Sequence, residues 1–413
     1  MRYLILGILL LGVGNSDGKE GESAKLARTA MVSPWSPKVS EAVEVELSAG
    51  KLAGAVVLVA QSGAPKHLGA YGLRSLESGE SMTVDTIFRI HSMTKAIVSA
   101  AALQQWEEGK FQLDDLISKY LPAFSEMKVW SEDGSTTAAG DEITVKDLFR
   151  HTSGLAYGFT APEELVGVYS SPKLWGGDLG QFCDELAKIP LVHEPGQSWR
   201  YGVNTDVLGR LVEIWSGQPL DEYLQSEFFD PLKMTSTGFM IKEGDQVRFA
   251  SVHSSGENGV TAGEDPLGQK YLLKPKMNSG GGGLVSTAMD YYQFLQMIAD
   301  GGERFVHQFL KSETVELMTT NQLPDSVTQI FFDDEQRTKI GFGLGFSVVT
   351  GPSEGWDEAA PINEFGWGGA ASCHYWVSPD DDNLIVITLE QTVPYNWNLE
   401  RAMKPLVYEL LGQ

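Results

Sequence analysis

A serine and a lysine three residues apart, at the head of an apolar run, constrain this chain more than any other feature. Ser92 and Lys95 lead into the run 96–103, which predicts a buried helix. Residues three apart on a helix lie about one turn above each other, so the amine of Lys95 can reach the Ser92 hydroxyl. The unpaired N–H groups at a helix start also stabilise the oxyanion formed in acyl transfer. We therefore predict that Ser92 is a nucleophile with a base beside it.

Two other segments match hydrolase motifs but lack the required context. Ser125 and Lys128 have the same spacing, yet a polar, glycine-containing stretch follows them, so we predict a loop there. The segment 351–355 matches the nucleophile elbow of another hydrolase fold, which needs a strand before its serine and a helix after it. A strand is predicted before Ser353, but Pro361 stops the segment that follows it. Ser353 is therefore the weaker alternative nucleophile.

Composition indicates a globular chain with a strong excess of negative charge. Its 413 residues, 42% of them hydrophobic, can bury a large core in one domain or two subdomains. The 55 acidic and 31 basic residues give a net charge of -24, which argues against nucleic acid or an anionic membrane as a partner. No Walker loop, dinucleotide fingerprint or zinc-ligand spacing occurs, so we expect no cofactor and no metal.

The N-terminus has the pattern of a secretory signal peptide. Met1 and Arg2 precede a short apolar stretch, and small and polar residues follow, so we assign 1–16 to a signal peptide. Residues 17–35 are polar for most of their length and are expected to form a flexible tether. The apolar stretch is short for a membrane span. We therefore expect a secreted or periplasmic protein, which would be membrane-anchored if the segment is not cleaved.

Hydrophobic periodicity predicts an α+β fold, with one sheet built from both chain ends and a mostly helical part between them. In the catalytic domain at 36–413, the α/β part would comprise about 36–112 and 239–413, and the helical part about 113–238. The expected helices are 36 to about 50, 92–109, 144–150, 205–215 and 398–411, and the expected strands are 55–60, 67–71, 342–349, 371–377 and 384–389. Cys183 and Cys373 are expected to pack in the interior, and the sequence does not say whether they pair.

Several segments resemble the serine β-lactamase-related hydrolases, the group that contains class C β-lactamases, D-alanyl peptidases and family VIII carboxylesterases. The resemblance covers about 37–411 and implies an antiparallel sheet flanked by N- and C-terminal helices, plus a helical subdomain. Besides Ser92 and Lys95, the matching segments are TVKDLFRHTSGL at 144–155, EPGQSWRYGVNTDVLG at 194–209, FDPLKMTSTGF at 229–239, GGGGLVSTAMDYYQFLQ at 280–296, FGLGF at 342–346, and 365–376.

In that family a tyrosine from the helical part acts as a second base, and Tyr201 stands at the matching position. An ordinary phenol titrates at about pH 10, so a neighbouring ammonium has to help it lose its proton. The resemblance leaves open whether Lys95 or Tyr201 deprotonates Ser92. Without the resemblance, Tyr201 would be interpreted as a buried tyrosine whose hydroxyl caps the helix near Thr205.

The resemblance also assigns a third motif, at Trp367 to Ala370. The N–H groups of Ser92 and Ala370 would form the oxyanion hole, while Gly368 and Gly369 would let an edge strand approach the substrate.

This motif departs from that of the penicillin-recognising members, which carry Lys-Thr-Gly there. Trp367 offers an indole N–H and an apolar face instead of an ammonium. Val203 stands where the lactamases have asparagine, and Asn204, one position later, is expected to cap or orient the next helix. Both changes remove polar contacts to β-lactam substrates and resemble family VIII esterases.

Other residues are expected near the acyl group. Tyr157, Phe159 and Trp175 either wall the pocket or pack in the core. Tyr375 follows the third motif on a strand whose residues alternate between two faces, and we assign it to substrate binding. His151 is expected to end a helix and not to act as a base.

These features predict a serine carboxylesterase whose partner is a small-molecule ester. The enzyme would cleave short to medium acyl esters through an acyl-enzyme on Ser92. An acceptor other than water would make it a transacylase. The alternatives are a β-lactamase or D-amino-acid peptidase on the same fold, and a penicillin-sensor-like binding protein that is acylated without release. The oligomeric state is left open.

Overall fold

The computed structural model describes residues 28–31, 34–268, 270–327, 330–332, 335–352 and 357–411. The expected signal peptide at 1–16 and the alternative nucleophile Ser353 lie outside these residues. Within the described ranges, no helix is long and apolar enough to cross a membrane.

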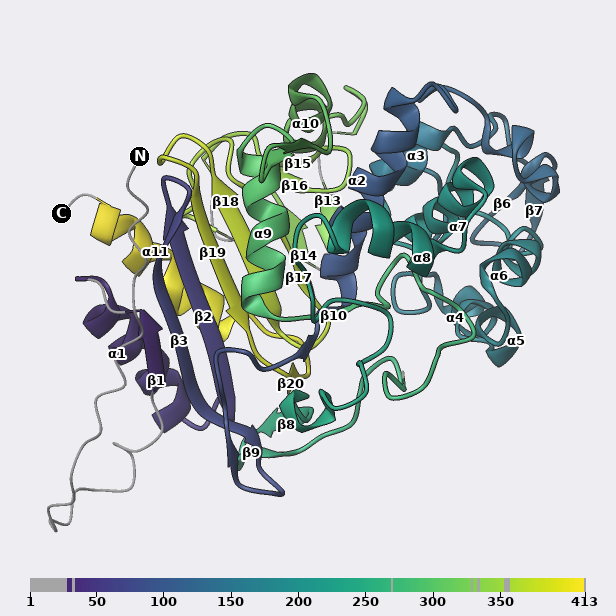
Figure 1. Ribbon diagram of the computed structural model, residues 1–413. Helices are drawn as coiled ribbons and strands as arrows, with labels where there is room; N and C mark the ends of the chain where they lie inside the picture. The colour runs from purple at the N-terminus through teal and green to yellow at the C-terminus, as the bar shows by residue number, and fades with distance from the viewer. Residues whose placement is uncertain are drawn as a thin grey trace, which may run out of the picture.

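An antiparallel sheet forms the centre of the described structure (Figure 1). Its nine described strands follow the order β1-β3-β2-β19-β18-β17-β16-β15, with β4 beside β3. Strands β2 and β19 are buried at nearly every position, which explains their continuous runs of β-branched and other apolar residues. The bounds are β1 (Arg28–Met31), β2 (Gly54–Gln61), β3 (Ala64–Ser75), β4 (Glu80–Ser81), β15 (Ile340–Phe342), β16 (Ser347–Val349), β17 (Phe365–Gly369), β18 (Cys373–Ser378) and β19 (Leu384–Leu389). Both ends of the chain therefore build one sheet, as predicted.

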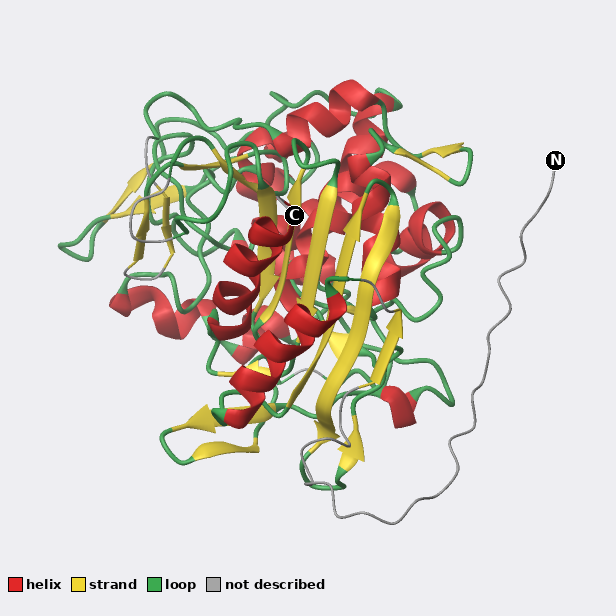
Figure 2. Cartoon of the chain, turned by 90° about the vertical axis from the view of Figure 1, so that its left-hand side faces the viewer, coloured by secondary structure: helices red, strands yellow, loops and turns green. Residues whose placement is uncertain are grey.

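Helices cover both faces of the sheet. Helices α1 (Ser36–Ser48) and α11 (Asn398–Leu411) pack on one face, which Figure 2 turns toward the viewer. Apolar side chains of these two helices, such as Val43 and Met403, meet the outward side chains of β2 and β19. Helix α9 (Ala288–Ala299) packs against β2 and β19 from the other face. The sheet is thus a buried layer between two helical layers.

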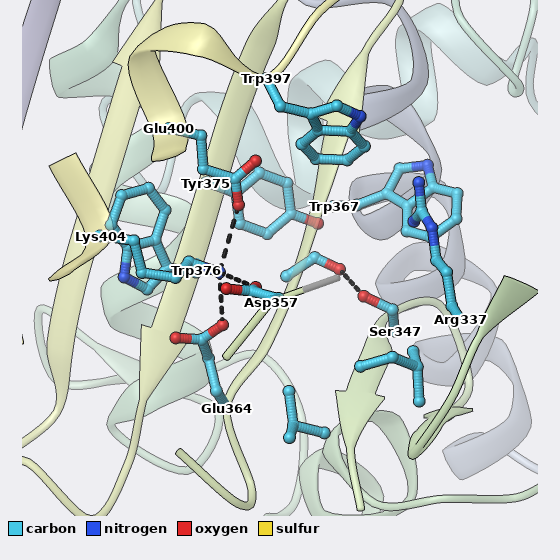
Figure 3. Close-up of a pocket in the computed structure, with 13 residues that line it drawn as sticks. Arg337, Ser347, Asp357, Glu364, Trp367, Tyr375, Trp376, Trp397, Glu400 and Lys404 are labelled. Atoms are coloured by element: carbon cyan, nitrogen blue, oxygen red, sulfur yellow. Dashed lines mark hydrogen bonds and ion pairs between the residues drawn. The ribbon is translucent and has the colours of Figure 1, made fainter. Parts of the chain in front are cut away.

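A buried ion cluster joins α11 to the segment before β17 (Figure 3). Nζ of Lys404 lies 2.5 Å from Asp357, 2.8 Å from Glu364 and 3.2 Å from Glu400. Burial raises the pKa of Glu364 to about 7. The cluster borders a cavity of about 30 Å³ that Trp367 also lines. Because Glu364 directly precedes β17, the cluster anchors the strand that carries Trp367.

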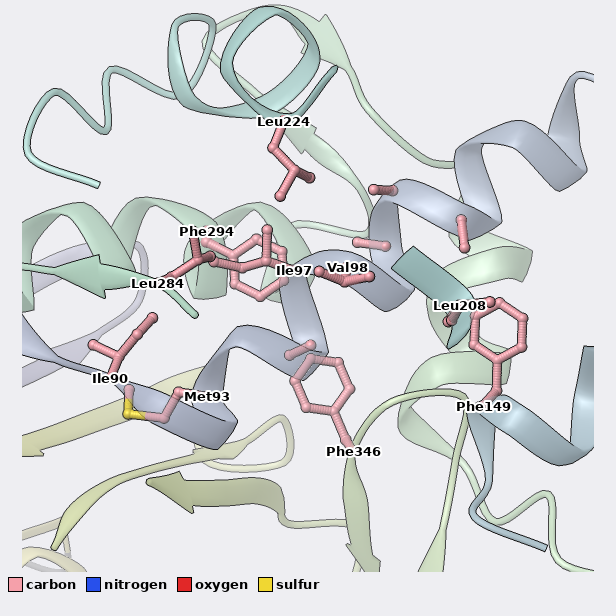
Figure 4. Close-up of a cluster of buried hydrophobic side chains, with 14 of the residues drawn as sticks. Ile90, Met93, Ile97, Val98, Phe149, Leu208, Leu224, Leu284, Phe294 and Phe346 are labelled. Atoms are coloured by element: carbon pink, nitrogen blue, oxygen red, sulfur yellow. The ribbon is translucent and has the colours of Figure 1, made fainter. Parts of the chain in front are cut away.

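Helix α2 (Thr94–Glu107) passes through the middle of the main core, between the sheet and the helical part (Figure 4). All of its residues from Thr94 to Leu103 are buried, so the apolar run is surrounded by protein instead of facing solvent on one side. Ile97 and Val98 pack in the cluster that also contains Phe294 of α9 and Phe346.

The helical part packs beyond α2, and α2 contacts α7. Its helices are α3 (Val145–Phe149), α4 (Glu163–Tyr169), α5 (Pro172–Trp175), α6 (Leu179–Leu186), α7 (Asn204–Ser216) and α8 (Leu220–Leu224), continued by the π-helical turn η5 (Gln225–Phe229). The remaining elements are β5 (Phe88–Arg89), η2 (His91–Met93), η3 (Ile117–Lys119), η4 (Pro122–Phe124), β6 (Lys128–Trp130), β7 (Thr136–Ala138), η6 (Gln246–Arg248), β8 (His253–Gly256), β9 (Gly259–Ala262), β10 (Val285–Ser286), β11 (Glu303–Arg304), β12 (His307–Gln308), α10 (Ser312–Thr319), β13 (Ile330–Phe332), β14 (Glu335–Arg337) and β20 (Thr392–Val393).

Four expectations need correction. Residues 28–31, placed in the tether, form β1 and pair with β3. The strand expected at 342–349 is instead two antiparallel strands, β15 and β16, because Gly345 turns the chain with a φ of +119°. Strand β17 is not an edge strand, since it lies between β16 and β18. The loop expected at Ser125 and Lys128 is a turn at Ser125, but Lys128 already begins strand β6. Both cysteines are buried and free.

Replacing Lys404 by methionine should destabilise the fold by about 3–5 kcal/mol, because it leaves buried carboxylates without their cation. Denaturant unfolding followed by circular dichroism measures the difference. The control is Lys173→Met, which removes an exposed ion pair with Glu185 and should cost about 1 kcal/mol or less. Equal unfolding midpoints for the two variants would show that the cluster does not stabilise the protein.

Candidate active site

Ser92 lies where a single 3-10 turn passes into helix α2. The turn η2 covers His91–Met93, and α2 begins at Thr94. His91 has a φ of +43°, in the left-handed region that non-glycine residues seldom adopt. Ser92 is partly exposed, whereas Lys95 is 3% exposed. The chain therefore presents the serine hydroxyl at the rim of a site whose lysine is buried.

The Lys95 amine is surrounded by three oxygen acceptors. Its Nζ lies 2.6 Å from the Gly281 carbonyl oxygen, 3.0 Å from the Tyr157 hydroxyl and 3.3 Å from Ser92 Oγ. The ring centroids of Tyr157 and Tyr201 lie 5.1 Å and 4.6 Å from the same nitrogen. An ammonium has three N–H donors, so these oxygens satisfy all of them. The contact between Ser92 and Lys95 that the spacing predicts is present.

Two tyrosines meet at Lys95, and they face it differently. Tyr157 supplies the hydroxyl that accepts a hydrogen bond from Lys95. Tyr201 turns its ring toward Lys95, while its hydroxyl accepts the indole N–H of Trp367 at 3.4 Å. The structure thus places the ring of Tyr201, and not its hydroxyl, beside Lys95. It adds Tyr157 as a polar partner of the lysine, beyond the wall role expected for it.

A buried polar contact fixes the segment that carries Tyr201. The side-chain amide of Asn204 donates to His151 Nδ1 at 2.8 Å and accepts from the Ser153 hydroxyl. The ring of His151 packs against that of Tyr201, with centroids 5.0 Å apart. Burial holds the pKa of His151 well below 6.5, so the ring is neutral. His151 and Asn204 therefore hold two chain segments together, and the side chain of Asn204 bonds to His151 and Ser153 and does not cap α7.

Strand β17 lies directly against the turn that carries Ser92. A Cβ at Gly369 would run into the carbonyl oxygen of Ile90 and lie 3.5 Å from Cβ of His91. A Cβ at Gly368 would instead lie 2.7 Å from the Tyr395 hydroxyl. Glycine at both positions allows this close packing. It brings the end of β17, where Ala370 follows, beside the start of α2.

Aromatic rings form the walls around Tyr201 and Trp367. The ring of Trp367 lies 5.3 Å from Tyr201 and 5.5 Å from Phe342. Tyr157 stacks on Phe159 at 5.3 Å, and Phe159 is 64% exposed. The other rings of this group are Trp175, Trp199 and Phe332. The site therefore combines a mostly buried aromatic cluster with an exposed aromatic ring at its rim.

Tyr375 is not part of an exposed wall, so its assignment to substrate binding is corrected. It is 2% exposed and packs against Tyr291 and Phe346, with ring centroids 5.1 Å and 6.2 Å away. Tyr375 pairs with Trp367 across the sheet. Strand β18 lies one strand further inside the sheet than β17, so the side chain of Tyr375 on this face enters the core.

Two polar groups of the site were not predicted from the sequence. Asp206 accepts hydrogen bonds from Tyr157 and from the backbone of Gly281, and the carbonyl of Gly281 accepts one from Lys95. The available signal was a charged residue at the start of an apolar helix and a run of four glycines at 280–283. Among the described residues, no group of His, Cys, Asp or Glu side chains is arranged to hold a metal ion.

Comparisons with known proteins find relatives along most of the chain. Residues 39–402 match the Beta-lactamase family. The chain is 34% identical over 354 residues to Protein Rv1367c of Mycobacterium tuberculosis, covering 84% of this chain and 87% of that protein. It is 27% identical over 387 residues to lovastatin esterase of Penicillium rubens, covering 87% and 94%. The structure of EstCE1, a hydrolase with promiscuous acyltransferase activity, has a TM-score of 0.75 at 24% identity, covering 91% of this chain and 98% of that one.

Replacing Gly369 by alanine should lower kcat/KM for an ester about 100-fold or more. The added methyl group would push β17 away from the turn at Ser92, and displacements of about 1 Å have effects of this size. The control is Gly167→Ala, where a Cβ meets nothing within 4 Å. Steady-state kinetics on both variants checks this, and full activity in Gly369→Ala would contradict the described packing.

Proposed function

The chain belongs to the Beta-lactamase family of serine hydrolases, and from this premise we propose that it is a carboxylesterase that forms an acyl-enzyme on Ser92. The observation that carries the proposal is the contact of 3.3 Å between Ser92 Oγ and the buried Nζ of Lys95 at the start of α2. Ester hydrolysis also agrees with the name of one relative, the lovastatin esterase of Penicillium rubens.

The proposed reaction has two halves. In each half, the catalytic base receives one proton and then gives it up. In the first, Ser92 Oγ attacks the ester carbonyl and gives its proton to the pair formed by Lys95 and Tyr201. The N–H groups of Ser92 and Ala370 hold the oxyanion. The C–O bond then breaks, and the leaving alcohol takes the proton. In the second half, water attacks the acyl carbonyl and gives a proton to the same pair. The C–O bond to Ser92 Oγ then breaks, this oxygen takes the proton back from the pair, and the acid leaves.

Trp367 and its aromatic neighbours define the proposed substrate class. The partly exposed ring of Trp367 and the exposed ring of Phe159 suit an uncharged short to medium acyl chain. Arg337 lies behind this wall, with its guanidinium carbon 5.9 Å from the Trp367 ring, and is 2% exposed. Its guanidinium stacks on Phe332 and Trp397, so its positive charge lies in the protein interior. The proposed pocket therefore favours neutral esters over substrates that need a cation for their carboxylate.

Acyl transfer to an alcohol is the second candidate function. The specific support is the fold shared with EstCE1, a hydrolase described as having promiscuous acyltransferase activity. The same acyl-enzyme serves both reactions, because only the acceptor differs. Adding methanol to the hydrolysis assay tests it: methyl ester formation supports acyl transfer, and acid alone supports hydrolysis.

Ser92→Ala should lower the rate of p-nitrophenyl butyrate hydrolysis by at least about 1000-fold, because the variant has no nucleophile to acylate. Initial rates of p-nitrophenol release measure the effect. Ser353→Ala is the matched control and should keep the activity of the unchanged protein. Activity that survives Ser92→Ala and disappears in Ser353→Ala would reverse the assignment.

Trp367→Lys should shift selectivity toward substrates that carry a carboxylate near the scissile bond. The ammonium would pair with that carboxylate, and we expect the ratio of cephalosporin to butyrate turnover to rise about tenfold or more. Measuring kcat/KM for nitrocefin and p-nitrophenyl butyrate gives the ratio. Trp367→Phe, which keeps the apolar ring, is the control. An unchanged ratio in Trp367→Lys would show that this position does not select the substrate.

A further inference from the structure

The hydrogen bonds around Lys95 lead to a second, deeper charged group. Asp206 is fully buried on α7, and its Oδ1 accepts from the Ser279 hydroxyl at 2.5 Å and from the Gly281 N–H at 3.0 Å. Its Oδ2 accepts from the Tyr157 hydroxyl at 3.5 Å. Tyr157 and Gly281 are also two of the three acceptors of Lys95. One carboxylate therefore holds two of the three groups that orient the lysine.

Gly281 shows how tightly this arrangement is packed. A Cβ at Gly281 would run into the Asp206 carboxylate and lie 2.5 Å from the Tyr157 hydroxyl. Glycine is therefore required for the carbonyl of residue 281 to reach Lys95 while Asp206 and Tyr157 keep their contact.

The direction of each hydrogen bond follows from the charges. A carboxylate accepts only, so the Tyr157 hydroxyl donates to Asp206 and turns a lone pair toward Lys95. Burial and the neighbouring Asp206 charge raise the pKa of Tyr157 well above 10, which keeps it a neutral phenol. Burial also raises the pKa of Asp206, while the Lys95 charge and the three donors oppose that rise.

We propose that Asp206 is a positioning residue, which through Tyr157 and Gly281 holds the Lys95 amine against Ser92 for proton transfer. Tyr157 is the intermediate member of this relay, and neither side chain needs to touch the substrate. The proposal rests on the proposed function, because it assigns a role in the reaction at Ser92.

The proposal predicts a loss in kcat with little change in KM. Asp206→Asn keeps the size of the side chain but removes its charge, and kcat for p-nitrophenyl butyrate should fall about 10- to 100-fold, with KM within about threefold. Tyr157→Phe should have a similar effect. The kcat of the double variant should be little lower than that of the less active single variant, because both residues act through the same amine.

The pH profile separates positioning from a merely structural role. The ionisable groups around Lys95 are Tyr157, Tyr201 and Asp206, and the buried His91 and His151 also lie within range of its charge. Without the negative charge of Asp206, a positive charge at this site is less well balanced. The ionisation that controls kcat should therefore move to lower pH by about one unit in Asp206→Asn.

The control is Asp290→Asn, another buried aspartate that accepts backbone and hydroxyl hydrogen bonds at a distant helix start. It should lower the thermal midpoint but leave the pH profile in place. An Asp206→Asn enzyme with unchanged kcat and pH profile would overturn the proposal, as would a loss of activity that only matches the unfolded fraction. Strictly additive losses in the double variant would also overturn it. Ser92→Ala run in parallel separates the two hypotheses: activity that survives it contradicts the proposed function itself.

Discussion

The contact between Lys95 and its three oxygen partners depends on burial, and the rest of the site is arranged around it. An amine in an apolar core is stable only when its donors are satisfied. Three different parts of the chain supply the acceptors: Ser92 lies in the turn η2 before α2, Tyr157 lies in the helical part, and Gly281 precedes β10. The site therefore forms only when the helical part and the sheet part have packed together on α2.

The same requirement explains the glycines and the ion cluster at the sheet. Gly369 lets β17 reach the turn before Ser92, and Gly281 lets a carbonyl reach Lys95 beside Asp206. On the other side of β17, Lys404 and its carboxylates anchor the segment from which the strand starts. Trp367 is thus held between a rigid interior and the aromatic pocket, and its indole N–H points to Tyr201.

Many helices and strands were predictable from the sequence, because the hydrophobic periodicity and composition of their segments indicate them. The terminal helix at 398–411 and the central strand at 384–389 were predicted with the bounds observed. Strand β1 was missed because four residues in a polar segment give no periodic signal, and the break at Gly345 depends on its backbone angle. The serine and lysine were predictable because they share one helical turn. The roles of Asp206 and Gly281 were not, because their contacts join residues far apart in the chain.

The proposed acyl-enzyme on Ser92 can be tested by locating the acyl group on the protein. The protein would be mixed with p-nitrophenyl butyrate, quenched in acid within the first turnovers and digested, and its peptides analysed by mass spectrometry. If Ser92 is the nucleophile, a butyryl group will be found on the peptide that contains Ser92 and will be absent from the Ser92→Ala variant. A butyryl group on another peptide, or product formation with no acylated peptide at any quench time, would contradict this assignment.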